Sequence, residues 1–586
     1  MNIASVKKVS MKFTCLAVTL VCLVPVAVAG IEPDFLMDTD PLLEVPRPIE
    51  NFNPAMSTLW LMALERPEID MQRMAAETIA QAHQFGIPDL RGAVPRLEQI
   101  LTGASTHPAA RFAAARALIV LESHGSADKL CAAAQDFGAD IQLLIEPALA
   151  TWDDESARAI WEQRLKSSES SPRELVLAIR GLGIVRDATA LEDLLSLCTD
   201  DTKSASVRLE AAAAAGNIAD RELEPRAELL ARSVQADSFV DQLCAVRLLA
   251  RHSSDSATRI LTDLAAHEKS AVAAAALQRL NEIDVALVLS LAPSAMQNAD
   301  PLVRREAAMA MLQRPDAGLV ATLGQMLGDV NPRLRRDVSS GLQKLAEQPE
   351  LNQPIRDSAL QMLTGEEWQG QEQAALLLGS LEHKPAADRL VQLLESQRPE
   401  VRLASAWALR KVAVRETIPA LIEEAMRKTE QRRIEGDSEQ LDREIAHLFE
   451  AIGVLHAEEA VSLLREYVPK RAGWHLSRGA AIWAIGKIRE GSRDADIESS
   501  LSSRILDFEP QPRESSLVKQ MSAIALARMQ AADQAQMMRE FAVSDGVDTR
   551  LKLALGWAVR HLTGEELPAP EPLTVSQGNW FLEPLP

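Results

Sequence analysis

Aromatic side chains are scarce in this sequence: they make up 4% of its 586 residues, with a single tyrosine. Apolar residues nevertheless reach 47%, so mainly aliphatic side chains and alanine must fill the interior. Strands favour β-branched and aromatic residues, whereas closely packed helices are rich in alanine and leucine. The composition therefore argues against a β-sheet protein and predicts an all-α fold. The chain is also too long for one ordinary core, so we expect several domains or one elongated array.

Basic residues are outnumbered, with 62 lysines and arginines against 83 acids and a formal net charge of −21. Nucleic acids and anionic lipid surfaces both bind through basic patches. The balance argues against either as a partner. A strongly acidic surface instead helps to keep a long alanine-rich protein in solution.

Cysteines are also few. Cys15 and Cys22 belong to the N-terminal segment, which leaves Cys131, Cys198 and Cys244 in the rest of the chain. Three cysteines without a C-x-x-C pair cannot form a disulfide framework. We expect buried thiols that pack as small apolar groups. One disulfide, or one reactive thiol, is the alternative.

Long apolar runs are absent apart from residues 13–29, which follow three lysines and end in Ala-Val-Ala. This is the pattern of a secretory signal peptide with cleavage between Ala29 and Gly30. Removing it takes away three lysines and no acid, which changes the net charge from −21 to −24. We expect an exported protein, periplasmic or secreted, without a membrane span after cleavage. An uncleaved anchor is the alternative, although the run is short for a membrane span.

A repeat dominates the remaining chain. Similar helix starts occur at residues 107, 171, 204, 237, 300, 331 and 398, separated by one or two units of 31 to 34 residues. Weaker copies extend the series to about fourteen or fifteen units over residues 67–563. Fixed-period similarity of this kind is the signature of a solenoid.

One unit, residues 401–425, reads "VRLASAWALRKVAVRETIPALIEEA". Its apolar residues recur at helical spacing on one face of a first helix and, after a short turn, on one face of a second. Pro399 and Pro419 stand in first turns, where a proline is tolerated. Such a hairpin buries its apolar face only by stacking on the next unit.

The segments "VRREAAMAML" and "LAIRGLGIVRDATALEDLLSL" resemble HEAT repeats, particularly the short phycobilin-lyase-like variety, with Gly183, Asp187 and Gly486 at consensus positions. The resemblance implies an α-α superhelix, an armadillo-like helical solenoid, over most of the chain. The consensus residues are structural and imply little about function.

Two sets of residues recur at fixed repeat positions. We expect the arginines to tie neighbouring units together, because arginine pairs well with fixed carboxylates and helix ends; they are Arg111, Arg208, Arg304, Arg335 and Arg402. Tryptophans recur at another position, as Trp407, Trp483 and Trp557. Their flanking residues favour packing within the helix layer, and a row of binding aromatics is the alternative.

The ends of the chain differ from the repeats. Residues 30–66 are predicted to contain an extended N-terminal cap, and residues 564–586 form a Pro-rich tail. Trp580 and Phe581 are too apolar to remain in water, so we expect the tail to fold back on the last unit; docking to a partner is the alternative. The charged segment 427–444 is predicted to be a solvated extension of a helix pair.

No catalytic or metal-binding motif stands out, and no cofactor is expected. Enzymes resembling deoxyhypusine hydroxylase bring several His-Glu pairs together at a di-iron centre, whereas here only His267-Glu268 occurs. The sequence therefore predicts a non-catalytic scaffold for an unidentified protein or peptide partner, of unknown oligomeric state. A repeat-built enzyme, either phycobilin-lyase-like or a metal-dependent oxidoreductase such as a deoxyhypusine-hydroxylase-like protein, is the alternative.

Overall fold

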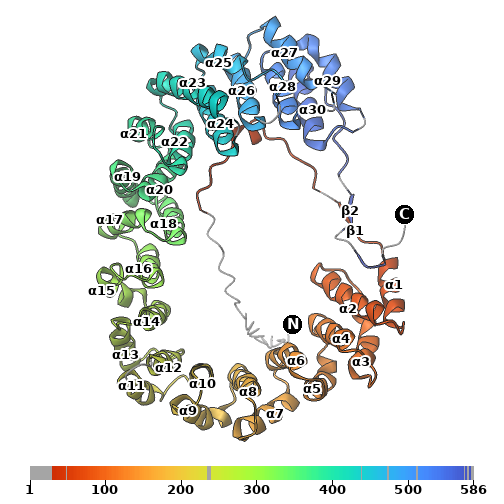
Figure 1. Cartoon of the computed structure of the whole chain (residues 1–586), viewed down its shortest axis with the longest axis vertical. Coiled ribbons are helices and arrows are strands. Elements are labelled where there is room, and N and C mark those ends of the chain that lie inside the picture. The colour runs from red at the N-terminus through yellow and green to blue at the C-terminus, as the bar shows by residue number, and fades with distance from the viewer. Residues whose placement is uncertain are drawn as a thin grey trace, which may run out of the picture.

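In the computed structural model the chain forms a ring of stacked helix pairs (Figure 1). The model describes residues 30–47, 49–233, 239–436, 438–471, 474–507, 509, 513–544, 546–572, 574–576 and 580–582. Thirty α-helices lie within these residues, which gives fifteen consecutive pairs and agrees with the number of repeats predicted. The predicted signal peptide, including Ala29, lies outside the described residues.

One helix of each pair faces the inside of the ring (Figure 1). These inner helices are α2 (Ile69–Gln84), α4 (Pro108–Val120), α6 (Ala139–Thr151), α8 (Pro172–Val185), α10 (Ala205–Ile218), α12 (Val240–Leu248), α14 (Ser270–Ile283), α16 (Pro301–Gln313), α18 (Pro332–Leu345), α20 (Trp368–Ser380), α22 (Pro399–Val412), α24 (Glu439–Val454), α26 (His475–Ile488), α28 (Ser516–Arg528) and α30 (Thr549–Thr563).

The other helix of each pair forms the outer layer. The outer helices are α1 (Ala55–Leu64), α3 (Val94–Thr102), α5 (Ala127–Asp136), α7 (Glu155–Lys166), α9 (Leu191–Thr199), α11 (Glu224–Ala231), α13 (Asp255–Ala265), α15 (Val285–Ala295), α17 (Ala317–Gln325), α19 (Pro349–Thr364), α21 (Ala387–Leu393), α23 (Ile418–Glu435), α25 (Val461–Arg465), α27 (Ala495–Ile505) and α29 (Ala535–Ala542).

Short 3-10 turns lead into many of the outer helices. They are η2 (Leu90–Ala93), η3 (His124–Ser126), η4 (Ala188–Ala190), η6 (Lys384–Ala386), η7 (Arg415–Thr417), η8 (Glu458–Ala460) and η9 (Ala532–Gln534), whereas η5 (Met326–Gly328) follows α17.

Six of the seven helix starts that the sequence predicts lie one residue before an inner helix, whereas residue 237 lies outside the described residues and α12 begins at Val240. Ser171, Asp300 and Asn331 accept hydrogen bonds from first-turn amides, and a proline follows each of them at the first helical position. A capping side chain satisfies an amide that has no partner within the helix, and proline lacks the amide that would otherwise be unpaired there. These caps fix where each repeat starts.

Small residues let consecutive inner helices approach closely. A side chain on Gly379 would place its Cβ 2.9 Å from the Cα of Ala408, and one on Gly453 would lie 2.9 Å from that of Ala484. Real Cβ atoms essentially never come so near a backbone atom, so glycine is required at both positions. The alanine-rich composition noted above serves this close packing.

The two ends of the array face each other, and two short strands lie between them (Figure 1). Strand β1 (Ile49–Asn51) precedes α1, strand β2 (Thr574–Ser576) follows α30, and the two pair in parallel with Ile49 opposite Thr574. The first helix begins at Ala55, so the expectation of a non-helical cap up to residue 66 is wrong for residues 55–64. The chain ends thus close the helical array into a ring.

Candidate functional site

An extended segment, residues 30–47, crosses the inner face of the later repeats; we call it the strap. It starts with Gly30 against the side chain of Arg336 on α18 and reaches α28, where Asp40 pairs with Arg528 (Figure 1). Within it, only Met37 is buried, in the single turn η1 (Leu36–Asp38), and the other strap residues are half-buried or exposed. The strap therefore lies along the inner face of the later repeats and does not cap the first repeat, whereas an N-terminal cap would be expected to do so.

Three successive inner helices hold strap residues that are spaced three apart. On α22, Trp407 Nε1 donates to Asp34 Oδ1 at 2.7 Å. On α24, Glu450 Oε1 accepts from the backbone amide of Met37 at 2.8 Å. On α26, Trp483 Nε1 donates to the backbone carbonyl of Asp40 at 2.9 Å.

These three anchors occupy the same position in their repeats. Trp407, Glu450 and Trp483 each precede an alanine and an aliphatic residue near the helix end, in "WALR", "EAIG" and "WAIG". Neighbouring helices pack about 8–10 Å apart. Three residues span at most about 10 Å when fully extended, and the turn η1 shortens the strap between Asp34 and Asp40. The anchors nevertheless fall one on each of three successive inner helices.

Charge reinforces the first and the last of the three anchor positions, Asp34 and Asp40. Arg410 on α22 donates to Asp34 Oδ1 at 2.6 Å and to Glu450 Oε2 at 2.8 Å. Arg528 Nη2 lies 2.8 Å from Asp40 Oδ1. Partial burial would raise the pKa of the Asp34 carboxyl, but the Trp407 hydrogen bond and the nearby cations outweigh it and hold the pKa below its ordinary value.

The groove beneath the strap contains polar atoms that the strap does not use. Phe35 stacks on the buried ring of His447, with centroids 4.4 Å apart and planes inclined by 9°. Burial lowers the pKa of His447, which favours the neutral imidazole. In the part of the chain that the structure describes, His447 Nε2, Arg410 Nε and Arg528 Nη1 are buried without a hydrogen-bond partner.

The C-terminal tail docks on the first repeat. Trp580 is 6% exposed and packs against the rings of Phe52, Trp60 and Phe85, with its ring centroid 5.6 Å from that of Trp60. Trp60 Nε1 donates to the carbonyl of Phe581 at 2.6 Å. The expectation that the tail folds onto the last unit is therefore wrong for Trp580 and Phe581, because the curvature of the array brings the first unit within their reach.

The tryptophan row divides into two kinds of residue. Trp407 and Trp483 are 3% and 0% exposed, and their rings pack against Gly379 and Gly453 of the preceding inner helix. The two rings thus pack within the helix layer, while their indole N–H groups bind the strap. Trp557 is half-buried and stacks on His561, with centroids 4.9 Å apart.

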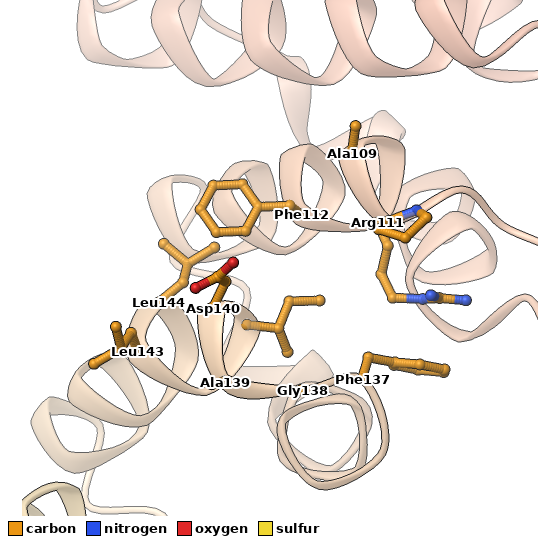
Figure 2. Close-up of a pocket in the computed structure, with 11 residues that line it drawn as sticks. Ala109, Arg111, Phe112, Phe137, Gly138, Ala139, Asp140, Leu143 and Leu144 are labelled. Atoms are coloured by element: carbon orange, nitrogen blue, oxygen red, sulfur yellow. The ribbon is translucent and has the colours of Figure 1, made fainter. Parts of the chain in front are cut away.

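A separate hollow lies between the N-terminal ends of α4 and α6, with a volume of about 820 Å³. Phe112 and Leu144 face each other across it, and Arg111 lies over the ring of Phe137 at 3.5 Å on one side (Figure 2). Phe112 is 38% exposed, which is high for a phenylalanine. The hollow is lined mainly by apolar side chains, with Arg111 and Asp140 as its charged residues.

The repeated arginines tie adjacent units together, as predicted. Arg304 binds both oxygens of Asp329 at 2.7 and 2.8 Å, and Arg402 binds both oxygens of Glu444 at 3.1 and 3.0 Å. The others bond to the carbonyls that end the preceding outer helix or to an acid of the next unit; they are Arg111, Arg208 and Arg335. Paired arginine–carboxylate bonds of this kind fix geometry as well as adding stability.

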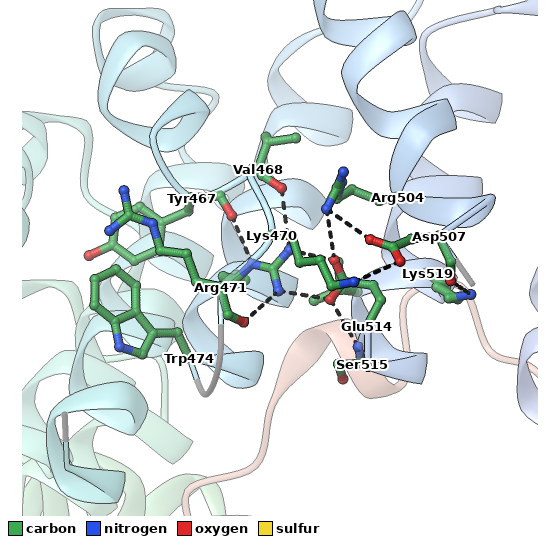
Figure 3. A network of polar contacts seen from close by, with 12 residues as sticks. Tyr467, Val468, Lys470, Arg471, Trp474, Arg504, Asp507, Glu514, Ser515 and Lys519 are labelled. Carbon is green, nitrogen blue, oxygen red and sulfur yellow. Dashed lines mark hydrogen bonds and ion pairs between the residues drawn. The ribbon is translucent and has the colours of Figure 1, made fainter. Parts of the chain in front are cut away.

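A larger polar network joins α26, α27 and the segment that leads into α28 (Figure 3). Arg478 donates to both oxygens of Glu514 at 2.8 and 2.9 Å, while Lys470 and Arg504 pair with Asp507. Burial would raise the pKa of Glu514, but the Arg478 bonds lower it below the ordinary value. Each of these acids pairs with a cation, so the role of the network is to hold neighbouring helices together.

The residues weighed for chemistry do not converge on one site, although the buried thiols of Cys198 and Cys244 are in hydrogen-bond contact. Among the described residues, no group of three or more His, Cys, Asp and Glu side chains could hold a metal ion. The His267 imidazole accepts from the amide of Lys269, and Glu268 lies in solvent. Cys131, Cys198 and Cys244 are buried and free, as predicted. Within the described part of the chain no helix has the length and apolar character needed to cross a membrane.

Comparison with known proteins agrees with this architecture. A family model described as HEAT repeats matches residues 356–441. No curated protein matches the sequence. A structure of Kap95p with RanGDP superposes with a TM-score of 0.51 at 15% identity, over 87% of this chain and 72% of that one. Kap121p bound to Pho4p superposes with a TM-score of 0.50 at 14% identity, over 87% of this chain and 57% of that one. Together with fifteen stacked helix pairs, these matches identify the fold: the protein is an all-α HEAT-repeat solenoid.

Proposed function

We propose that the chain is an exported, non-catalytic scaffold that holds protein segments against the inside of its ring. One observation carries this proposal: the inner face already binds an extended segment, the strap, with one anchor from each of three successive repeats. Repeat proteins use such concave surfaces to hold extended partners.

The similar folds support the same class of function. The matched Kap121p structure has Pho4p bound, so a solenoid of comparable shape can hold a protein partner. At this level of identity the likeness concerns the fold and not the partner. We also propose that the repeats are of the short phycobilin-lyase-like kind, on the evidence of Gly183, Asp187 and Gly486.

Export rests on the N-terminal residues 1–29. Cleavage there would make Gly30, the residue against Arg336, the first residue of the mature chain. N-terminal sequencing of the protein recovered from the periplasm or the medium tests this. An intact residue 1 on the recovered protein would contradict it.

A pair of crosslinking variants tests the scaffold function. A photoreactive amino acid in place of Phe112, on the inner helix α4, should crosslink to protein partners during export. The matched control carries it in place of Leu229, which is exposed on the outer helix α11. Equal adducts from both positions, or stoichiometric iron or zinc in the purified protein, would contradict a non-catalytic inner-face scaffold.

A further inference from the structure

We propose that the strap is an exchangeable internal ligand. The groove beneath it, formed by α22, α24, α26 and α28, accepts an extended acidic segment of a partner protein with the pattern Asp-x-x-apolar-x-x-Asp. The inference rests on the proposed scaffold function and names the partner chemistry for one part of the inner face.

The anchors depend more on the spacing of the residues in the bound segment than on their identity. The groove binds the amide of Met37 and the carbonyl of Asp40, which are backbone atoms that any extended segment offers. Side chains matter at three points: the carboxylates of Asp34 and Asp40, and the apolar side chain of Met37, which is 2% exposed. A foreign segment with an acid, an apolar residue and an acid at the same spacing can make every one of these contacts.

The strap leaves some polar groups of the groove without a hydrogen-bond partner in the part of the chain that the structure describes. Arg410 Nε, Arg528 Nη1 and His447 Nε2 are buried beneath it with no hydrogen-bond partner among the described residues. A buried donor without a partner is costly to a folded protein. A segment that carries one or two further acceptors opposite the two arginine N–H groups would therefore gain hydrogen bonds that the strap does not make.

The surroundings favour an acidic occupant. Lys411 and Lys487 lie within 4 Å of strap carboxylates, in addition to the two arginines. This cationic groove stands out in a chain with a net charge of −21. Opposite charges of this kind raise the rate of encounter and select against basic or neutral partners.

The strap can leave without unfolding a repeat. It has no strand partner before β1, and Leu42 and Val45 are 70% and 45% exposed. Its attachment to the chain gives it a high effective concentration, on the order of millimolar for a short connection. A partner segment therefore competes with the strap for the groove, and it displaces the strap if its affinity or its local concentration is high enough.

A synthetic peptide tests the competition directly. The probe is fluorescent "GIEPDFLMDTDPLLEV", residues 30–45, added to the whole mature chain and followed by anisotropy. A strap-detached variant carries Asp34→Ala, Phe35→Ala and Asp40→Ala in its own strap. We expect it to bind the peptide at least about tenfold more tightly than the wild-type chain, because the internal competitor is weakened.

A matched pair of tryptophan variants locates the binding. In the strap-detached chain, Trp407→Phe keeps an aromatic ring but loses the indole donor to Asp34, and should weaken peptide binding about tenfold. Trp557→Phe changes the equivalent residue of the last repeat and should leave the affinity within about twofold. Hydrogen exchange supplies a second readout in the wild-type chain, where excess peptide should speed exchange of the Met37 amide.

The proposal is wrong if the folded strap-detached chain does not bind the peptide, or if both tryptophan variants bind equally. If the wild-type chain forms dimers that the peptide dissociates, the occupant is the strap of a second copy and the partner assignment is wrong. Crosslinking from position 112 is independent of these results. Its success beside a failed peptide assay would overturn the exchangeable strap alone, and its failure would overturn the scaffold function.

Discussion

Replacing Trp580 with alanine should open the ring. The side chain is 6% exposed among Phe52, Trp60 and Phe85, and removing a core tryptophan costs about 3–5 kcal/mol. This loss of free energy weakens the docking of the tail and not the folding of the repeats, because each helix pair is stabilised mainly by its neighbours. Each 1.4 kcal/mol changes an equilibrium about tenfold, so the lower figure raises the ratio of open to closed rings on the order of a hundredfold.

A distance measurement across the closure tests this reasoning. Spin labels at two exposed positions, Met62 on α1 and Arg560 on α30, report the separation of the two ends by pulsed electron resonance. We expect one short, narrow distance distribution in the parent protein and a broad, longer one after Trp580→Ala. Trp152→Ala, which alters a half-buried ring that packs against His124 far from the closure, is the matched control. An unchanged distribution together with unchanged hydrogen exchange in β1 would refute closure by the tail.

Three other contacts in the ring can be tested by their effect on stability or on local hydrogen exchange. Asp329→Ala leaves the buried Arg304 without its carboxylate and should lower the free energy of unfolding by about 3–5 kcal/mol, measured by urea denaturation. Gly216→Ala would place a Cβ 2.2 Å from a carbonyl oxygen of the next inner helix and should cost about 1–3 kcal/mol in the same assay. Acid should weaken the joint at Glu514: Arg478 lowers the pKa of that carboxyl, so its contribution is complete above the ordinary value near 4.5 and is lost as the pH falls below it. Hydrogen exchange in α28 between pH 7 and 3 follows this loss.

Each of these tests has a matched control. Asp263→Ala removes an exposed acid 3.6 Å from its partner, and such pairs contribute about 0–1 kcal/mol. Gly92→Ala adds a Cβ that meets nothing within 4 Å. Glu514→Gln should remove the acid-dependent part of α28 exchange. A control as damaging as its test variant would contradict the corresponding account.

The repeat architecture could be predicted because local sequence patterns specify it. Helical spacing, prolines in first turns and capping residues such as Ser171 specify each hairpin within about thirty residues of sequence. The role of Arg304 and its equivalents was predictable for the same reason, since their partners lie in the same or the next repeat.

The long-range contacts were not predictable from such patterns. Trp580 was rightly expected to be buried, but its partner depends on the curvature of the whole array, which accumulates from small rotations between repeats. The strap contacts join residues separated by up to 488 positions. The charged segment 427–444 forms the predicted helical extension, but Arg432 is buried with Asp442 and Ser477, contrary to the solvated surface expected.

The closure of the ring also makes the fold sensitive to its own completeness. The contacts from Met37 to Glu450 and from Trp60 to Phe581 span 413 and 521 positions, so neither can form until the late repeats exist. A chain interrupted before α22 would leave two defects at once: an acidic strap without its groove and an aromatic pocket on the first repeat without Trp580. Exposed apolar surface of this kind is what chaperones and proteases recognise in unfinished proteins. Docking of the strap and of Trp580 therefore couples the first repeat to the presence of the late repeats.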